Sequence, residues 1–114
     1  MIANREQRSY LQYNLVMLTK ADVYDRLKTV MDPELHIDIV GLGLIYDVEV
    51  KAKMIKVTMT LTTPGCPLAP EIDRLVREAM KPLGDYVVEL ELVWEPAWAK
   101  EMMSEEAKLT LGMI

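Results

Sequence analysis

The segment Met54-Ile55-Lys56-Val57-Thr58-Met59-Thr60-Leu61-Thr62 alternates apolar and polar side chains from Ile55 onward. This period of two predicts a β-strand with one buried face. Residues 45–50 alternate in the same way, and Lys51-Ala52-Lys53 forms a short polar connection between the two segments. The pattern predicts a β-hairpin at the centre of the fold.

A helix and a third strand are expected after the hairpin. Apolar residues at positions 72, 75, 76 and 79 recur with helical spacing, which predicts a helix over residues 70–80 that Pro82 and Gly84 end. Alternating leucines and glutamates predict a strand over residues 86–93. Because a strand–helix–strand unit makes a right-handed crossover, the second and third strands should be parallel.

Two further helices complete the expected order. Thr19 is typical of a helix N-cap, and this helix should continue to about Met31, because Asp32 precedes a proline. A last helix is expected from Ser104 through Leu109. The predicted fold is therefore a two-layer α/β (α+β) domain in the order α-β-β-α-β-α, with a small mixed sheet and helices on one face. Residues 1–18 form an N-terminal arm of uncertain structure, and residues 19–114 form the domain.

Composition excludes several classes of function. A chain of 114 residues builds one modest core. The formal net charge of −5 argues against a nucleic-acid partner, and no apolar run reaches the roughly 20 residues of a membrane span. A single cysteine excludes an internal disulfide framework and fits the reducing cytoplasm, where we expect the protein to act.

That cysteine, Cys66, lies in a Gly/Pro-rich loop between the second strand and the next helix. The amides and the dipole of a helix N-terminus favour a thiolate, and Thr62 and Thr63 add hydroxyl donors. Pro67 keeps Cys66 in an extended conformation. A reactive loop thiol and a buried, inert thiol are both open interpretations.

A second group of polar residues alternates at positions 32, 34, 36 and 38. If extended, Asp32, Glu34, His36 and Asp38 would point to one side and could bind a divalent metal ion. The alternative is a turn that the Asp-Pro pair begins. A Cys–His hydrolase would need His36, the only histidine, beside Cys66.

Two aromatic residues follow the third strand. Trp94 and Trp98 flank Pro96, either as a plug that closes the core or as a contact surface for a partner protein. Gly41 and Gly43 lack the third glycine and the following helix of a nucleotide-binding loop, so we interpret them as shaping the entry into the first strand.

Four motifs, taken in order and spacing, closely resemble the MIP18 family of metal–sulfur cluster biosynthetic proteins, which includes SufT-like and PaaD-like members. They are Asp32-Pro33-Glu34-Leu35, Val40-Gly41-Leu42-Gly43-Leu44-Ile45-Tyr46, Thr62-Thr63-Pro64-Gly65-Cys66-Pro67-Leu68 and Trp94-Glu95-Pro96-Ala97-Trp98. The resemblance extends from about Thr19 to the C-terminus.

This resemblance implies an accessory factor in iron–sulfur cluster assembly or delivery. By position it implies a site of Asp32, Glu34, Thr62, Thr63 and Cys66, in which Cys66 and the two acids are metal ligands and the threonines contact the cargo. The implied partners are cluster carriers or scaffolds, including P-loop ATPase carriers, and client apoproteins. PaaD-like relatives carry a cysteine-rich C-terminal segment that this sequence lacks, which favours a SufT-like role.

One thiol cannot hold a cluster, because clusters are usually bound by four cysteines or by cysteines and histidines. We therefore expect a transient cluster or iron ion, none of it tightly bound, with further ligands from a second chain of a homodimer or from a client. Two other functions stay open. One is a thiol-dependent enzyme with Cys66 as nucleophile and Glu34 as acid/base, and the other is an interaction module that uses Trp94 and Trp98.

Overall fold

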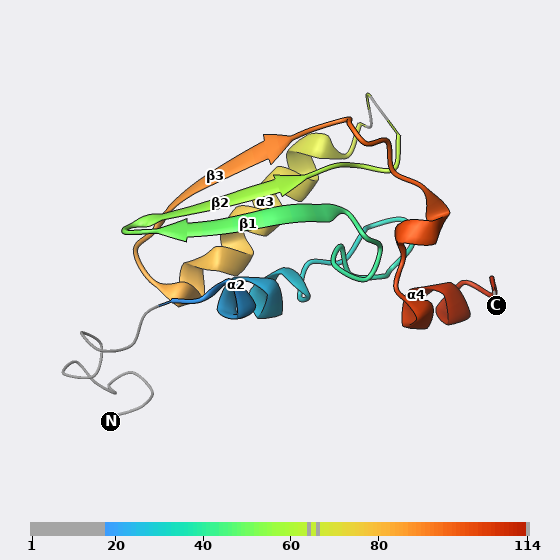
Figure 1. Ribbon diagram of the computed structural model, residues 1–114, viewed down its shortest axis with the longest axis horizontal. Helices are drawn as coiled ribbons and strands as arrows, with labels where there is room; N and C mark the ends of the chain where they lie inside the picture. The colour runs from blue at the N-terminus through green and yellow to red at the C-terminus, as the bar shows by residue number, and fades with distance from the viewer. Residues whose placement is uncertain (1–17, 64, 66, 114) are drawn as a thin grey trace.

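The computed structural model describes residues 18–63, 65 and 67–113. The N-terminal arm expected over residues 1–18 lies outside them, except Leu18, which packs against the core. The helices and strands follow the predicted order (Figure 1), with two additional 3-10 turns: α2 Lys20–Leu27, β1 Ile45–Lys51, β2 Met54–Met59, α3 Ala69–Met80, η1 Lys81–Leu83, β3 Val87–Leu92, η2 Lys100–Met102 and α4 Glu105–Thr110.

The three strands form one mixed sheet in the order β1-β2-β3. β1 pairs antiparallel with β2, and β2 pairs parallel with β3, as the crossover rule predicted. Along β2 the predicted alternation is realised, since Ile55, Val57 and Met59 are fully buried while the residues between them are half-buried.

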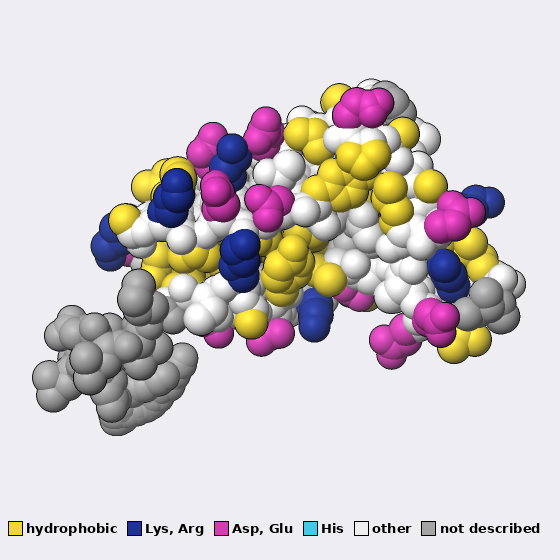
Figure 2. All heavy atoms as spheres, viewed as in Figure 1, with side chains coloured by type: hydrophobic (Ala, Val, Ile, Leu, Met, Phe, Trp, Pro, Cys, Tyr) yellow, Lys and Arg dark blue, Asp and Glu magenta, His cyan; other side chains and the backbone are white. Residues whose placement is uncertain are grey.

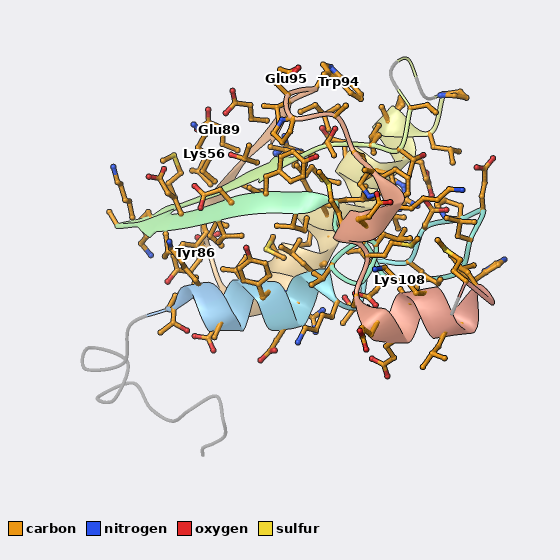
Figure 3. All side chains as sticks on the ribbon, turned by 45° about the vertical axis from the view of Figure 1, so that its right-hand side comes forward. Lys56, Tyr86, Glu89, Trp94, Glu95 and Lys108 are labelled. Atoms are coloured by element: carbon orange, nitrogen blue, oxygen red, sulfur yellow. The ribbon has the colours of Figure 1, made fainter. Side chains whose placement is uncertain are left out.

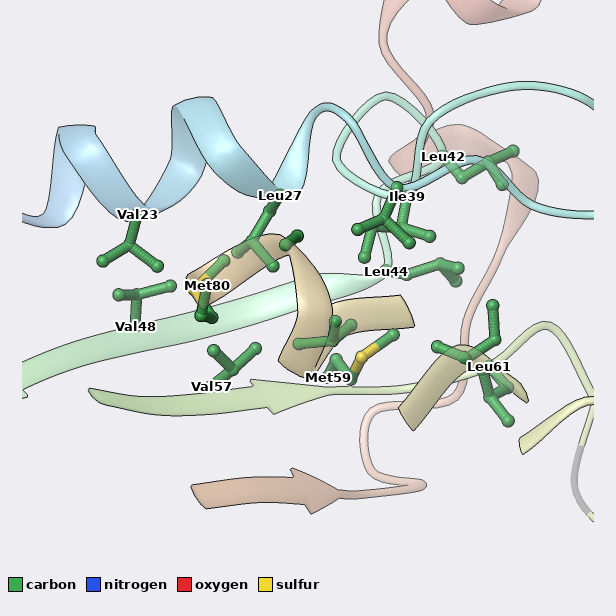
Figure 4. Packing of buried hydrophobic residues seen from close by; sticks show 14 of the residues in the cluster. Val23, Leu27, Ile39, Leu42, Leu44, Val48, Val57, Met59, Leu61 and Met80 are labelled. Carbon is green, nitrogen blue, oxygen red and sulfur yellow. The ribbon is translucent and has the colours of Figure 1, made fainter. Parts of the chain in front are cut away.

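Both longer helices cover the same face of the sheet, and the core lies between the two layers. Val23 and Leu27 of α2 and Met80 of α3 meet Val48 and Val57 of the sheet (Figure 4). The opposite face of the sheet, turned to the viewer in Figure 1, carries no helix of the described chain and is called the open face below. α4 lies beyond the end of the sheet.

Both predicted N-caps are present. The Thr19 hydroxyl accepts from the amide of Asp22, whose carboxylate in turn accepts from the Thr19 amide, which completes a capping box. Ser104 accepts from the amide of Ala107 at the start of α4. These caps satisfy amides that the first helical turn leaves without a partner.

The predicted end of the first helix was wrong. α2 ends at Leu27 rather than near Met31, because the last amides turn to closer carbonyls: Thr29 N–H donates to Arg26 and Val30 N–H to Leu27. Val30 then accepts from Ile39 N–H at 3.0 Å, so it is buried by the returning chain and not by a helical face. Within the described ranges, no helix is long and apolar enough to cross a bilayer.

Candidate functional site

Three chain segments gather at one end of the sheet, where β1 begins and β2 and β3 end (Figure 1). They are residues 30–44, the described part of 60–68, and 93–104, and together they are called the loop end. Thr60 N–H donates to the Leu44 carbonyl at 2.9 Å, and the Trp98 indole N–H donates to the Leu42 carbonyl at 2.7 Å. These two bonds join the first segment of the loop end to each of the other two.

The glycine-rich entry into β1 is packed directly against the third segment. Gly43 has a φ of +79°, and a β-carbon there would lie 2.3 Å from the Met102 carbonyl oxygen. Gly41 accepts from the amide of Ser104 at 2.8 Å. The interpretation of these glycines as shaping the entry into the strand is confirmed, and close backbone approach adds a reason for Gly43.

The segment from Asp32 to Ile37 forms a turn and not an extended strand. One carboxylate oxygen of Asp32 accepts from the amides of Glu34 at 2.8 Å and Leu35 at 2.9 Å. His36 takes a left-handed conformation with a φ of 58°. The four alternating polar residues therefore do not share one side, and the turn interpretation is the one the structure adopts.

The described residues contain no group of three His, Cys, Asp or Glu side chains that could hold a metal ion. Asp38 accepts from the amide of Gly41 at 2.8 Å and so also serves a turn. Glu34 and His36 are exposed. The predicted set of Asp32, Glu34 and Cys66 includes a residue outside the described ones, so it stays a prediction.

The loop between β2 and α3 holds the predicted thiol site. Thr62 is half-buried, Thr63 is exposed, and Cys66 lies outside the described residues. α3 starts at Ala69 with a proline in its first turn, and its N-cap residue is Leu68, whose side chain has no hydrogen-bonding atom. The positive end of the helix dipole is directed toward the preceding loop, where it would favour an anion.

Acidic side chains in the first turns of α3 would oppose a thiolate, but both are paired with arginines farther along the helix. Glu71 accepts from Arg74 at 2.8 Å, and this hydrogen bond lowers the pKa of Glu71. Asp73 accepts from Arg77 one turn later. The pairing directs both carboxylates along the helix toward positive charge, which weakens their repulsion of an anion at the N-terminus.

The two tryptophans have different environments. Trp98 packs against the core and donates its indole N–H to Leu42, so it is the plug. Trp94 is 41% exposed. It lies two residues after the end of β3, and Figure 3 shows it beside the loop that joins β2 to α3. The two segments are neighbours because the parallel strands β2 and β3 end at the same edge of the sheet. Trp94 is therefore the tryptophan of this pair that a partner can reach.

Sequence reasoning did not identify Tyr46 as an anchor of this end. Its hydroxyl donates to the Pro96 carbonyl at 2.8 Å and lies 3.6 Å from the Met102 sulfur. A half-buried tyrosine on a strand signals that its hydroxyl has a partner, but the pattern does not say which. The bond ties the Trp94–Trp98 segment to the start of β1.

An open depression of about 510 Å³ lies elsewhere, at the C-terminal end of α3 and the start of β3. Its lining residues are Arg77, Met80, Lys81, Gly84, Asp85, Tyr86 and Val88. Because α3 separates it from the loop end, it does not belong to the candidate site.

Comparison with known proteins identifies the family. Residues 20–92 match the family described as iron–sulfur cluster assembly protein. The match covers more than half of the chain and includes three of the four motifs, those at 32–35, 40–46 and 62–68. The chain belongs to this family, which confirms the resemblance drawn from the motifs.

Similar proteins have closely related names. The "Fe-S protein maturation auxiliary factor YitW" of Bacillus subtilis is 44% identical over 96 residues, covering 82% of this chain and 94% of that protein. The "Fe-S protein maturation auxiliary factor SufT" of Staphylococcus aureus is 45% identical over 86 residues, or 74% of this chain and 98% of the other. An "Iron-sulfur cluster carrier protein" of Deinococcus radiodurans is 48% identical over 54 residues, which is 47% of this chain and 15% of the carrier.

The fold has a solved counterpart as well. The crystal structure of a domain of unknown function, DUF59, from Bacillus anthracis superposes with a TM-score of 0.78 at 40% identity. The superposition covers 82% of this chain and 92% of that chain. The predicted small mixed sheet with helices is therefore shared with a relative of similar length.

Proposed function

We propose that this chain is an accessory factor in iron–sulfur cluster assembly or in delivery of clusters to client proteins, and that it acts through the thiol of Cys66. The observation that carries the proposal is the family match over residues 20–92, which includes the Thr62–Leu68 loop. The alignments with relatives named as maturation auxiliary factors cover nearly the whole length of those relatives, which supports a SufT-like role.

The loop end supports a thiolate at Cys66 on physical grounds. The loop leads into the start of α3, and the acids nearest that helix start are paired with arginines. Helix amides and the dipole then favour the anion, which is the form that binds iron. Thr63, an exposed hydroxyl in the same loop, would donate to the sulfur or the cargo.

The cluster is cargo and not a resident cofactor. With one thiol per chain, the remaining ligands come from a second copy or from the partner that gives or receives the cluster. Asp32 and Glu34 would add oxygen ligands, which bind iron more weakly than thiolates. A weak and shared site suits a protein that must pass its cargo on.

Trp94 gives the loop end a contact for carriers and clients. It is exposed, stands at the exit of β3, and lies beside the loop of Cys66 (Figure 3). Exposed tryptophans often provide much of the binding energy at protein interfaces. A stretch of the Deinococcus carrier protein is similar to this chain, which supports a cluster carrier as one such partner.

Replacing Cys66 tests the proposal directly. Cys66→Ser should fold, with a free energy of unfolding within about 1 kcal/mol of the native value, because one loop side chain contributes little to the core. It should fail to support maturation of iron–sulfur clients in cells that lack the native protein. Met113→Ser removes another exposed sulfur, outside the loop end, and should support maturation normally.

If a folded Cys66→Ser protein supports maturation, the thiol has no role in it. The remaining hypothesis would then be an interaction module centred on Trp94. Anaerobic analysis of iron and acid-labile sulfide distinguishes the proposed assembly factor from the other alternative, a thiol-dependent enzyme. If the native protein never acquires iron from a loaded carrier but its thiol turns over a substrate, the thiol-enzyme function holds instead.

A further inference from the structure

The outer edge of β3 has backbone groups without a partner strand. β3 is the last strand of the sheet, and in Figure 1 no helix or strand of the described residues lies beyond it. Val87 and Val93 donate their amides inward to Lys53 and Met59, so the alternate residues direct their amides and carbonyls outward. Arg77 donates to the outward carbonyl of Val88 at 2.7 Å.

Farther along, the outward groups of Leu90 and Leu92 are bonded by nothing in the described part of the chain. Such an edge is a template for an added strand. The side chains at this edge also favour an added strand. Val88, Leu90 and Leu92 face the core but stay half-buried at this border of the sheet. Apolar residues of an added strand would complete their burial.

The charges at this edge define the kind of strand that fits. Residues 82–99 contain four acidic side chains and no basic one. Glu89 and Glu91 project from β3 onto the open face, where Figure 2 shows acidic side chains gathered. Glu91 pairs with Lys56 at 3.3 Å, and Figure 3 shows Glu89 beside the same lysine. A neighbouring strand with basic residues on that face would oppose these carboxylates.

A second copy of this chain is a poor occupant for the same reason. Two β3 edges paired antiparallel would place glutamate opposite glutamate, and like charges directly across a strand pair are destabilising. An extended segment in which basic and apolar residues alternate has the complementary pattern on both faces. The direction of the edge also matters, because it leads from Leu90 to Trp94 and the loop of Cys66.

We propose that the free edge of β3 binds an extended segment of a client or carrier by strand addition, and that the segment alternates basic with apolar residues. The inference rests on the proposed function for the identity of the partner. Strand addition would hold the segment by main-chain hydrogen bonds and deliver the adjoining part of the partner to the loop end.

The test uses the full chain and a short synthetic peptide in which lysine alternates with valine. Amide NMR spectra recorded during titration should show the largest shifts, and slowed exchange, at Leu90 and Leu92. A peptide of the same composition, with lysines and valines in separate blocks, should bind at least tenfold more weakly, because it cannot match both faces.

Charge reversal provides a matched pair of variants. Glu49 and Glu89 flank Lys56 in one cross-strand row, on opposite edges of the sheet. Glu89→Lys should weaken peptide binding about tenfold, since attraction becomes repulsion at one cross-strand pair. Glu49→Lys changes the net charge equally and should leave binding within about twofold.

Equal losses in the two variants, or shifts centred on β1, would overturn the proposal and reduce the effect to general charge attraction. Cys66→Ser should bind the peptide like the native chain, because the edge does not involve the thiol. Failure of client maturation and failure of strand addition are thereby measured separately.

Discussion

Gly43 shows how a single residue sets the geometry of the loop end. Its positive φ is costly for other residues, and the Met102 carbonyl leaves no space for a side chain. Asp32 acts at the same scale by holding two amides of the following turn on one carboxylate oxygen. Individual residues thus fix the backbone of the first segment of the loop end.

Gly43→Ala should lower the free energy of unfolding by about 3 kcal/mol or more, because the backbone strain and the overlap with Met102 add. Gly112→Ala is the matched control, since Gly112 has a φ of +75° but no atom within 4 Å of the added carbon. It should cost about 1 kcal/mol from strain alone. Urea unfolding measures both, and equal losses would show that the close approach to Met102 is unimportant.

The two tryptophans should separate stability from binding. Trp98→Ala should lower the free energy of unfolding by about 3 kcal/mol, because it empties a packed position and leaves the Leu42 carbonyl without its donor. Trp94→Ala should change it by less than about 1 kcal/mol while weakening capture of a cluster carrier. The checks are urea unfolding and a pull-down with the carrier. A large loss of stability in Trp94→Ala would show that both residues belong to the plug.

At the scale of elements, α3 links the loop end to the rest of the fold. Its first turns carry Glu71 and Asp73, and its arginines take up both charges. Arg77 also reaches Val88 and so ties the helix to the edge strand β3. The same helix therefore neutralises two of its own acidic side chains and limits the free edge of the sheet at Val88.

The pKa of Glu71 should depend on Arg74. The hydrogen bond to Arg74 lowers this pKa, so its contribution to stability is complete above the ordinary carboxylate pKa and is lost as the pH falls through the lowered value. Arg74→Ala should raise the pKa of Glu71 toward its ordinary value in an NMR titration. Arg77→Ala removes an equal charge one turn later and should leave this pKa nearly unchanged; a similar rise in both variants would indicate a general field effect instead.

At the scale of the whole molecule, one small core supports both the sheet and the loop end. The core joins both helices to one face of the sheet and reaches the loop end through Leu42, Leu44 and Leu61 (Figure 4). The open face and the β3 edge carry no further helix or strand of the described residues, and Trp94 is exposed. This division suits a factor that brings carrier and client together.

Reconstitution with iron and sulfide under anaerobic conditions should give a dimer whose iron content depends on Cys66, because one thiol per chain is too few for a cluster. Light scattering after size-exclusion chromatography, combined with iron analysis, measures both properties. Cys66→Ser treated in the same way should stay free of iron. A monomer that holds a complete, stable cluster would contradict sharing between chains.

The sequence by itself determined the elements and their order. A period of two along residues 54–62, a helical stripe over residues 70–80 and the rule for crossovers were enough to predict the mixed sheet, and the local caps at Thr19 and Ser104 formed as expected. Four motifs also identified the family. These features can be predicted from the sequence because each depends on residues that are close together in the chain.

The tertiary structure alone decided where α2 ends and which tryptophan packs against the core. Val30 leaves the helix because Ile39 pairs with it, and Trp98 is a plug because it reaches Leu42, 56 positions away in the chain. Such long-range contacts form only when the chain folds, and local sequence periodicity does not predict them. For that reason the sequence placed Trp94 and Trp98 in one motif, and only the fold gave them different environments.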